Sequence, residues 1–336
     1  MRERFGGGVV RRDRLPTVTA SPGGGVVVLC RCGLSLRFML HNDAKTAPIV
    51  QIKENGGALA LAANAFPLPV GPINAGGSCD AVTGACVDCY AGGLESRAPA
   101  YGAGAGVNLA NLQHLKACGG HSAVVSALVA CVQHSENQQR ARGVVSPVFR
   151  WHSGGDIFAT WYGRAIRSAV VATSSVDHWI YTRDAVKVKA LLPKPDNLAV
   201  YLSADSFNVV KMARAGARLG LPLAMLADNQ THAVELWARA LAVASVPSAV
   251  ECPVSGKWAR DGVDVPAHVV GLDGRRSSAA RGALGVGACV ACGVCLPASL
   301  GRSVTFLLHG GKNSGKTAGR LGSAIRRRSI PLAVAL

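Results

Sequence analysis

The chain has few charged residues: Asp, Glu, Lys and Arg make up 16% of its 336 residues, against about 25% in an average soluble domain. Aromatic residues are also scarce, at 5%. Apolar residues nevertheless reach 49%, which excludes a highly charged disordered chain. At this length the chain can bury a large core without disulfide bonds.

Long uncharged apolar runs are also lacking. The best candidate for a membrane span, residues 23–40, is interrupted by Arg31 and Arg37, whereas a span needs about 18 or more apolar residues. The N-terminus shows no apolar stretch followed by a small-residue cleavage site, so we predict no secretory signal peptide. We therefore expect a cytoplasmic protein with no membrane association.

Acidic residues number only 19 against 36 Lys and Arg, which gives a formal net charge of +17. Residues 1–45 carry +5 and residues 301–336 carry +7, so the long segment between them is nearly balanced at +5. We expect a poorly ordered, Gly/Arg-rich extension over 1–45 and a flexible basic tail over 312–336. Both ends could contact nucleic acid non-specifically.

The tail begins in a run, 310–317, that satisfies the P-loop pattern G-x-x-x-x-G-K-[ST]. Only 19 residues follow Thr317, which is too few for the remaining strands of an ordinary P-loop protein. We expect this run to belong to the flexible tail.

Short apolar runs alternate with segments of helical spacing along the middle of the chain. The predicted strands are 65–70, 147–152, 178–182, 198–203, 223–227, 268–272 and 304–308. The predicted helices are 108–117, 122–140, 157–171, 206–219 and 231–244. Near-continuous apolar strands that alternate with helices indicate a parallel sheet buried on both faces. We predict an α/β fold, a partial (β/α) barrel of parallel strands over 46–250, with a Cys-rich cluster-binding segment and last strand over 251–311.

Polar and aromatic residues follow several predicted strands, at the carboxyl ends where parallel folds gather their chemistry. Some of the acids there, Asp205 among them, could simply open the next helix as caps. Their accumulation on one rim favours a pocket, in which Arg183 would anchor an anion. The expected pocket residues are Trp151, His152, Tyr181, Arg183, Tyr201, Ser203 and Asp205.

Cysteine is the distinctive residue type, with 11 in the chain. Cys79, Cys86 and Cys89 form a C-x6-C-x2-C pattern in a loop after the first predicted strand. Three thiolates from one loop can hold three irons of a [4Fe–4S] cluster and leave the fourth iron open for S-adenosylmethionine. The alternative is a structural zinc site completed by a distant ligand.

A second group combines C-x2-C-x2-C at Cys289, Cys292 and Cys295 with the upstream Cys252. This spacing favours a second [4Fe–4S] cluster, with four-thiolate zinc as the alternative. Of the remaining cysteines, we expect Cys118 and Cys131 to be buried in helices and assign no role to the Cys30-x-Cys32 pair.

Several of these segments together resemble the gene product 88 family, radical-SAM-like proteins of actinobacterial phages and mobile elements. The resemblance spans roughly residues 40–311. It rests on 86–95 (CVDCYAGGLE), 149–156 (FRWHSGGD), 181–183 (YTR), 201–205 (YLSAD), 224–228 (AMLAD), Cys252-Pro253, 267–268 and the cluster ending at Pro297.

The resemblance implies a radical-SAM-like barrel in which Cys79, Cys86 and Cys89 bind the cluster. It also implies that a variant of the Gly-Gly-Glu element receives the amino group of S-adenosylmethionine, at Gly154, Gly155 and Asp156. Two features depart from the radical-SAM pattern: the first cysteine gap is six residues instead of three, and Asp156 is shorter than Glu.

The expected function is therefore reductive cleavage of S-adenosylmethionine on an unknown substrate. The alternative is a non-catalytic, Fe–S- or Zn-stabilised phage or plasmid protein that binds nucleic acid through its basic ends.

Overall fold

The computed structural model describes residues 18–21, 25–43, 62–80, 86, 89–228, 230–247, 249–252, 295–297 and 302–307. The predicted strand at 268–272, Cys289, Cys292, the P-loop-like run and the basic tail lie outside these described residues.

The main sheet has seven strands, all parallel, in the order β4-β5-β6-β7-β8-β10-β9. The strands are β4 (Ala65–Phe66), β5 (Val148–Trp151), β6 (Asp177–Thr182), β7 (Leu198–Ala204), β8 (Leu223–Ala227), β9 (Ala249–Glu251) and β10 (Ser303–Leu307). The predicted α/β class and parallel sheet are confirmed, with β9 as an additional strand. The first five strands are neighbours in chain order, as in a (β/α) barrel. However, β10 lies between β8 and β9, and the described strands leave β4 and β9 as open edges.

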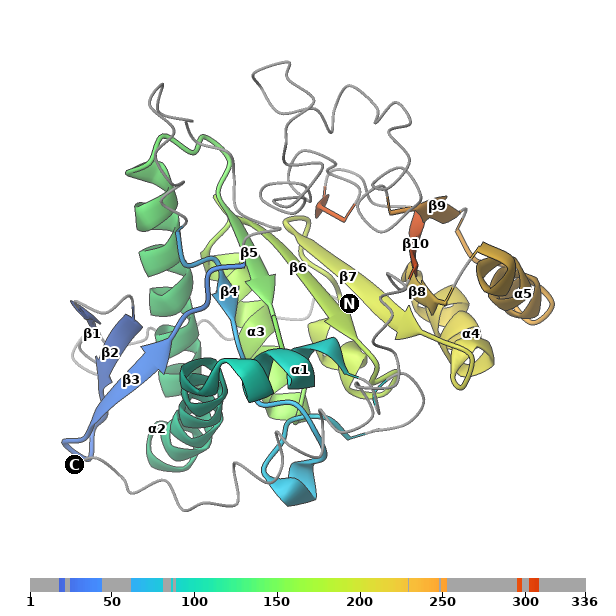
Figure 1. The fold of residues 1–336 in the computed structure, drawn as a ribbon. Coiled ribbons are helices and arrows are strands. Elements are labelled where there is room, and N and C mark those ends of the chain that lie inside the picture. Colours follow the sequence, from blue (N-terminus) through green and yellow to red (C-terminus); the bar gives the residue numbers. More distant parts are fainter. Residues whose placement is uncertain are drawn as a thin grey trace, which may run out of the picture.

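Within the described residues, five α-helices and two short 3₁₀ helices accompany the sheet. They are η3 (Ile73–Ala75), α1 (Tyr90–Arg97), α2 (Pro99–Arg140), α3 (Thr160–Ala172), η5 (Lys187–Leu191), α4 (Val209–Leu219) and α5 (Gln230–Leu241). Helix α2 contains both helices predicted at 108–117 and 122–140, joined at Gly120, whose φ of 68° and ψ of −157° interrupt the helical path. A positive φ is readily adopted only by glycine. The arrowheads of β5, β6 and β7 point to the same lower edge of the sheet, where α1 lies (Figure 1).

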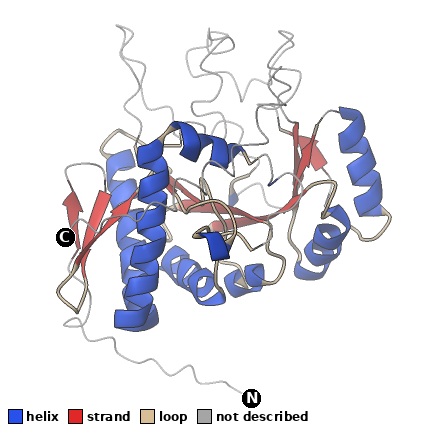
Figure 2. Ribbon diagram, turned by 60° about the horizontal axis from the view of Figure 1, so that its bottom comes forward, coloured by secondary structure: helices blue, strands red, loops and turns tan. Residues whose placement is uncertain are grey.

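The two faces of the sheet differ in what covers them. One face packs against α3, α4 and α5 in a large apolar core that includes Phe149, Ile180 and Met225. The strand residues of the opposite face form a smaller cluster around Trp179 and Tyr201, against which Cys252 and Cys295 pack. We call this second surface the inner face. Helix α1 and helix α3 lie on opposite sides of the sheet (Figure 2).

A separate antiparallel sheet precedes the main one, formed by β1 (Val18–Ser21), β2 (Gly25–Leu29) and β3 (Ser35–Met39). The structure differs here from the expected poorly ordered extension over 1–45. Alternate residues of β2 and β3 are buried in the main core. In β3, for example, Leu36 and Phe38 are buried and Arg37 between them is exposed. This period-two pattern is typical of a strand with one buried face, and the glycine and arginine content of the segment obscured it.

Asparagine side chains of α2 hold β3 in place. Buried Asn108 accepts a hydrogen bond from Met39 N (2.8 Å) and donates to Met39 O (2.8 Å) and Pro67 O (3.0 Å). One turn further along, Asn111 donates to Arg37 O (2.8 Å). Two successive turns of α2 therefore attach β3, and with it the small sheet, to the helix.

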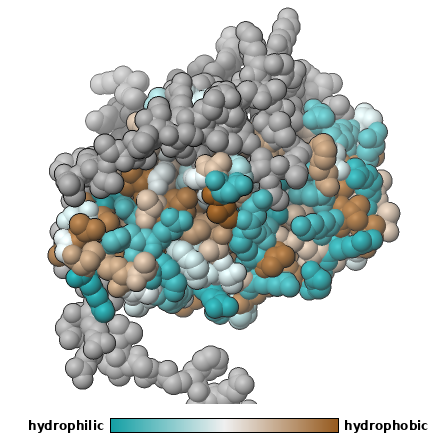
Figure 3. Space-filling model, turned by 90° about the horizontal axis from the view of Figure 1, so that it is seen from below, coloured by the Kyte–Doolittle hydropathy of each residue, from teal (hydrophilic) through white to brown (hydrophobic). Residues whose placement is uncertain are grey.

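Among the described helices, α2 is long and apolar enough to cross a membrane, judged by length and composition alone. The search for apolar runs in the sequence overlooked this segment. Core helices of globular folds have the same properties, and here residues such as Leu112, Leu115 and Leu128 of α2 are fully buried in the main core. Seen from below, the described surface is a mixture of hydrophilic residues and separate hydrophobic patches (Figure 3).

Candidate functional site at the carboxyl edge of the sheet

Hydrogen bonds fix the segment between β4 and Cys79. Glu95 of α1 is buried and accepts a hydrogen bond from Val70 N at 2.7 Å. Ser78 donates its hydroxyl to Pro69 O (2.8 Å), and Cys79 N donates to Gly71 O (2.9 Å). These bonds fix the start of the cysteine loop at the carboxyl end of the sheet.

The thiols of Cys86 and Cys89 lie close enough to Cys79 for their charges to act on it. Cys79 is half-buried, and desolvation raises the pKa of its thiol, which the charges of Asp156, Cys89 and Cys86 raise further. Burial also raises the pKa of Cys89, which immediately precedes α1, and the nearby backbone N–H groups of Gly92 and Ala91 lower it in part. A helix N-terminus favours a bound anion such as a thiolate. These thiols would ionise most readily with a bound cation.

Gly154 and Gly155 follow β5 and lie next to the residues that lead into the cysteine loop. Gly155 has a φ of 82°, and a Cβ added there would lie 2.3 Å from Ser78 Oγ and 2.7 Å from Leu68 Cβ. A Cβ on Gly154 would lie 2.8 Å from the Tyr101 hydroxyl. The backbone after β5 therefore has no room for a Cβ at either position: Gly155 lies against Ser78, which precedes Cys79, and Gly154 lies against Tyr101 of α2.

The buried carboxylate of Asp156 joins the ends of two strands. Its Oδ1 accepts a hydrogen bond from Ile157 N (2.7 Å) and its Oδ2 accepts one from Arg183 N (2.9 Å). Burial raises the pKa of this carboxyl, and hydrogen bonds from Thr182, Arg183 and Ile157 lower it in part. Because both oxygens already accept hydrogen bonds, the side chain of Asp156 positions the ends of the strands. Its contact with the amino group of S-adenosylmethionine stays a prediction.

Arg183 lies between the cysteine loop and the end of β7. Its Nη2 donates to Asp205 Oδ2 at 2.8 Å, and its charge lowers the pKa of the nearby Cys89. Asp205 also accepts a hydrogen bond from Phe207 N (3.0 Å), so it shapes the turn before α4 as well. The buried Nε of Arg183 has no hydrogen-bond partner within the described part of the chain, which leaves a donor for an anion.

The other predicted pocket residues fall on two different faces. Tyr181 and Tyr201 lie together on the inner face, with ring centroids 5.6 Å apart, and the half-buried Ser203 follows Tyr201 by one strand repeat. Trp151 is fully buried in the helix-covered core instead. His152, with a φ of 62°, turns to the same side, where its Nε2 lies 3.1 Å from the Tyr162 hydroxyl. The structure therefore does not bring Trp151 and His152 into one pocket with the tyrosines.

Residues of the inner face that the sequence reasoning missed include Arg150, Trp179 and Phe306. The guanidinium of Arg150 lies 5.6 Å from the centre of the Tyr181 ring and pairs with Asp43. Phe306 packs edge-on to Tyr181 at 5.9 Å. An arginine in the middle of an otherwise apolar strand was the available signal for a functional face.

The second cysteine group lies at the other end of the sheet. Cys252 directly follows β9, and its backbone N–H donates to Thr305 O at 2.8 Å. Cys252 and Cys295 both pack against the inner face, while Cys289 and Cys292 lie outside the described residues. The Cys79 loop follows β4, which is the opposite edge strand, so the two cysteine groups belong to opposite edges of one sheet.

The family model for gene product 88 matches residues 34–297. The chain belongs to the gene product 88 family. The match includes β3, the Cys79–Cys89 loop and the second cysteine group through Pro297. Comparison with curated proteins and with solved structures gives no match. Gene product 88 is thus a family assignment that carries no activity with it.

This member of the gene product 88 family has a further group of metal-ligand side chains. Cys30 and Cys32, in the turn between β2 and β3, meet His114 and Cys118 of α2, and all four ligand atoms lie within 4.8 Å of one another. The group could hold a metal ion. Hydrogen bonds from the Leu34 backbone and then from His114 lower the pKa of the Cys32 thiol to about 6.

The sequence analysis gave none of these four residues a role. A C-x-C pair in a hairpin turn and an H-x3-C pair on one face of a helix were the signals that could have found them.

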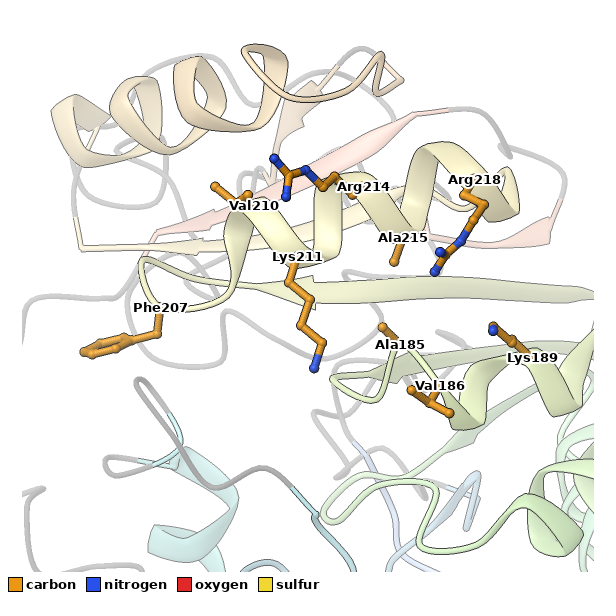
Figure 4. A pocket seen from close by; sticks show the side chains of 9 residues that line it. All are labelled: Ala185, Val186, Lys189, Phe207, Val210, Lys211, Arg214, Ala215 and Arg218. Atoms are coloured by element: carbon orange, nitrogen blue, oxygen red, sulfur yellow. The ribbon is translucent and has the colours of Figure 1, made fainter.

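A basic groove lies between η5 and α4, with a volume of about 480 Å³. Lys189, Lys211, Arg214 and Arg218 line it, together with the exposed Phe207. Lys211 and Arg218 extend from α4 toward the η5 side of the groove, and Phe207 lies at one end (Figure 4). Four cations and an exposed aromatic ring form a suitable surface for a polyanion.

Proposed function

We propose that this protein is a radical-SAM-like iron–sulfur enzyme. In this proposal Cys79, Cys86 and Cys89 bind a [4Fe–4S] cluster at the carboxyl edge of the sheet. With three protein ligands such a cluster leaves one iron for S-adenosylmethionine, and the chemistry it supplies is one-electron reductive cleavage of that cofactor.

One observation carries the proposal: at the carboxyl end of a parallel sheet, Cys86 and Cys89 lie within electrostatic range of Cys79, and Ser78, which precedes Cys79, lies against the Gly155 backbone. The thiolates of a cubane bind different irons and therefore lie farther apart than the ligands of a single ion. Three cysteines spaced along one loop fit this larger separation. The close glycine backbone leaves peptide groups near the loop for the cofactor. Arg183, with its buried Nε, is placed to bind a carboxylate or another anion.

The strand order supports a partial barrel around this site. Strands β4 to β8 are neighbours in chain order, and their helices pack on the outer face, so the inner face would line the barrel. In this proposal the half-buried Tyr181 and Arg150 contact the substrate, while the fully buried Tyr201 supports the Tyr181 ring. A tyrosine and an arginine suit an aromatic or anionic molecule. Cys252 and Cys295 would contribute to a second cluster, or to zinc, at the far edge of the same face. The reducing cytoplasm is the compartment that such thiols need.

Anaerobic reconstitution tests the proposal. We expect the full chain, loaded with iron and sulfide, to bind about four irons at the first site, and about eight if the second site also holds a cluster. With dithionite and S-adenosylmethionine it should release 5′-deoxyadenosine. Zinc in place of iron at the first site, together with no release of 5′-deoxyadenosine, would refute the proposal.

The basic groove favours a second, accessory function. We propose that it binds single-stranded nucleic acid, because its four cations can contact phosphates and Phe207 can stack on a base. This places the nucleic-acid contact on the folded part of the chain, in addition to the basic ends.

Charge reversal in the groove should weaken this binding. Lys211→Glu removes one phosphate contact, so the slope of log affinity against log salt should fall by about 0.7, measured by fluorescence anisotropy with labelled oligo-dT. Arg164→Glu on the exposed face of α3 is the matched control and should leave the slope unchanged. An equal loss in both variants would show that only the total charge of the protein matters.

A further inference from the structure

The four residues Cys30, Cys32, His114 and Cys118 bring together segments that are far apart in the sequence. Cys32 Sγ lies 3.1 Å from His114 Nε2, across 82 positions of the chain. His114 and Cys118 are four residues apart on α2 and therefore project from the same face of that helix. The three cysteines are thiols without a disulfide bond.

The size of the group fits a single metal ion. Four ligands at about 2.0–2.3 Å from one ion lie about 3.5–3.8 Å apart when arranged as a tetrahedron. The four ligand atoms here all lie within 4.8 Å of one another, so a small adjustment of the side chains suffices. Three thiolates and one imidazole are a common ligand set of structural zinc sites.

The hairpin turn has the backbone arrangement that such a site needs. Gly33 N donates to Cys30 O (2.9 Å) and Cys30 N donates to Leu34 O (2.8 Å), with Gly33 at a φ of 87°. The backbone N–H of Cys32 donates to the Cys30 sulfur, and that of Leu34 to the Cys32 sulfur. Hydrogen bonds from backbone N–H groups stabilise thiolate ligands and fix their orientation.

The position of the group explains what an ion would do there. Asn108 and Asn111 attach β3 to α2 near Met39 and Arg37, and the next turn of the same helix face carries His114. The ion site thus continues this row of contacts to the tip of the hairpin, where Cys32 and Leu34 are exposed. A three-stranded sheet of four- and five-residue strands has little stability of its own, and a metal that links it to α2 closes a long loop of chain.

We propose that Cys30, Cys32, His114 and Cys118 bind one Zn²⁺ in a closed structural site that fixes the β1–β3 sheet on α2. All four positions of the ion are taken by protein ligands, so the site has no catalytic role. The site is distinct from both predicted cluster sites and does not depend on the proposed enzymatic function.

The test is metal analysis of the full chain purified anaerobically from zinc-containing medium. We expect about one zinc per chain if the second cysteine group holds iron, and about two if that group also holds zinc. X-ray absorption at the zinc edge should show three sulfur ligands at about 2.3 Å and one nitrogen at about 2.0–2.1 Å. A shell of four sulfurs would assign the zinc to the second cysteine group and overturn the proposal, as would a Cys30–Cys118 disulfide in the same sample.

Variants separate this site from the iron sites. Cys32→Ser and His114→Asn should each lower bound zinc at least tenfold and leave bound iron unchanged. Cys131→Ser and His134→Asn, on the same helix but outside the group, should keep the zinc. Protease cleavage between residues 25 and 43 should become faster in the zinc-depleted variants. Zinc retained in both Cys32→Ser and His114→Asn would contradict the assignment, and the absorption spectrum of the unmodified chain remains decisive if either variant does not fold.

Discussion

Cys89→Ala is expected to remove about four irons per chain and to abolish release of 5′-deoxyadenosine. Cys89 lies within electrostatic range of Cys79 and immediately before α1, next to the backbone N–H groups of Gly92 and Ala91. Alanine removes one of only three protein ligands, and a cubane held by two cysteines is not retained. Iron and sulfide quantification after anaerobic reconstitution, followed by chromatography of the reaction products, measures both effects.

Cys131→Ala is the matched control for this substitution. Cys131 is fully buried in the apolar core on α2 and belongs to neither predicted cluster site. This variant should keep its iron and its product release, although its midpoint of chemical unfolding should fall. Full iron content in Cys89→Ala would show that this loop does not hold the cluster.

Gly155→Ala should destabilise the site by backbone strain and by steric overlap with the start of the cysteine loop. Its φ of 82° costs a non-glycine residue about 1–2 kcal/mol. The new Cβ would also lie 2.3 Å from Ser78 Oγ and 2.9 Å from Leu68 O, which adds roughly 1–3 kcal/mol of overpacking. Because Ser78 must move and precedes Cys79, bound iron should fall together with the free energy of unfolding.

Gly220→Ala is the control that separates the cost of a positive φ from the cost of steric overlap at Gly155. Gly220 has a φ of 67°, and a Cβ there would meet no atom within 4 Å. This control should show only the cost of the positive φ, with unchanged iron content. Equal losses of unfolding free energy in the two variants, measured by urea denaturation, would mean that the Gly155 backbone does not pack against the cysteine loop as described.

The two cysteine groups of the main sheet lie on either side of the inner face, which is the organisation that the proposed enzymatic function requires. The Cys79 loop follows edge strand β4, Cys252 follows edge strand β9, and the tyrosines of β6 and β7 lie between them on the inner face. A substrate on this face would lie between the two metal sites. The zinc site proposed on α2 is separate, because it concerns the attachment of the β1–β3 sheet.

The local pattern of the sequence was enough to predict most strands and helices of the main sheet. Apolar periodicity acts over a few residues, so it located β5 to β8 and α3 to α5 without knowledge of their neighbours. The same locality applies to Cys79, Cys86 and Cys89, which cannot lie far apart in any fold because only ten positions separate the first from the last.

The sequence could not show which way the residues of a buried strand point. Both faces of β5 are covered, so Arg150 and Trp151 are neighbours in a nearly unbroken apolar run, and the pattern does not distinguish the helix side from the inner face. The same reasoning placed Trp151 and His152 in one pocket with Tyr181, from which the structure separates them.

By itself, then, the sequence determined the α/β class, the strands and helices of the core, the basic ends and the local cysteine loop, all of which depend on residues close together in the chain. Only the tertiary structure decided which side chains share the inner face, and only it brought Cys30 and Cys32 to His114 and Cys118. The physical reason is distance along the chain. Contacts between residues some 80 positions apart depend on how a hairpin packs against a helix, and although the C-x-C and H-x3-C pairs are each visible locally, the sequence does not show that they meet.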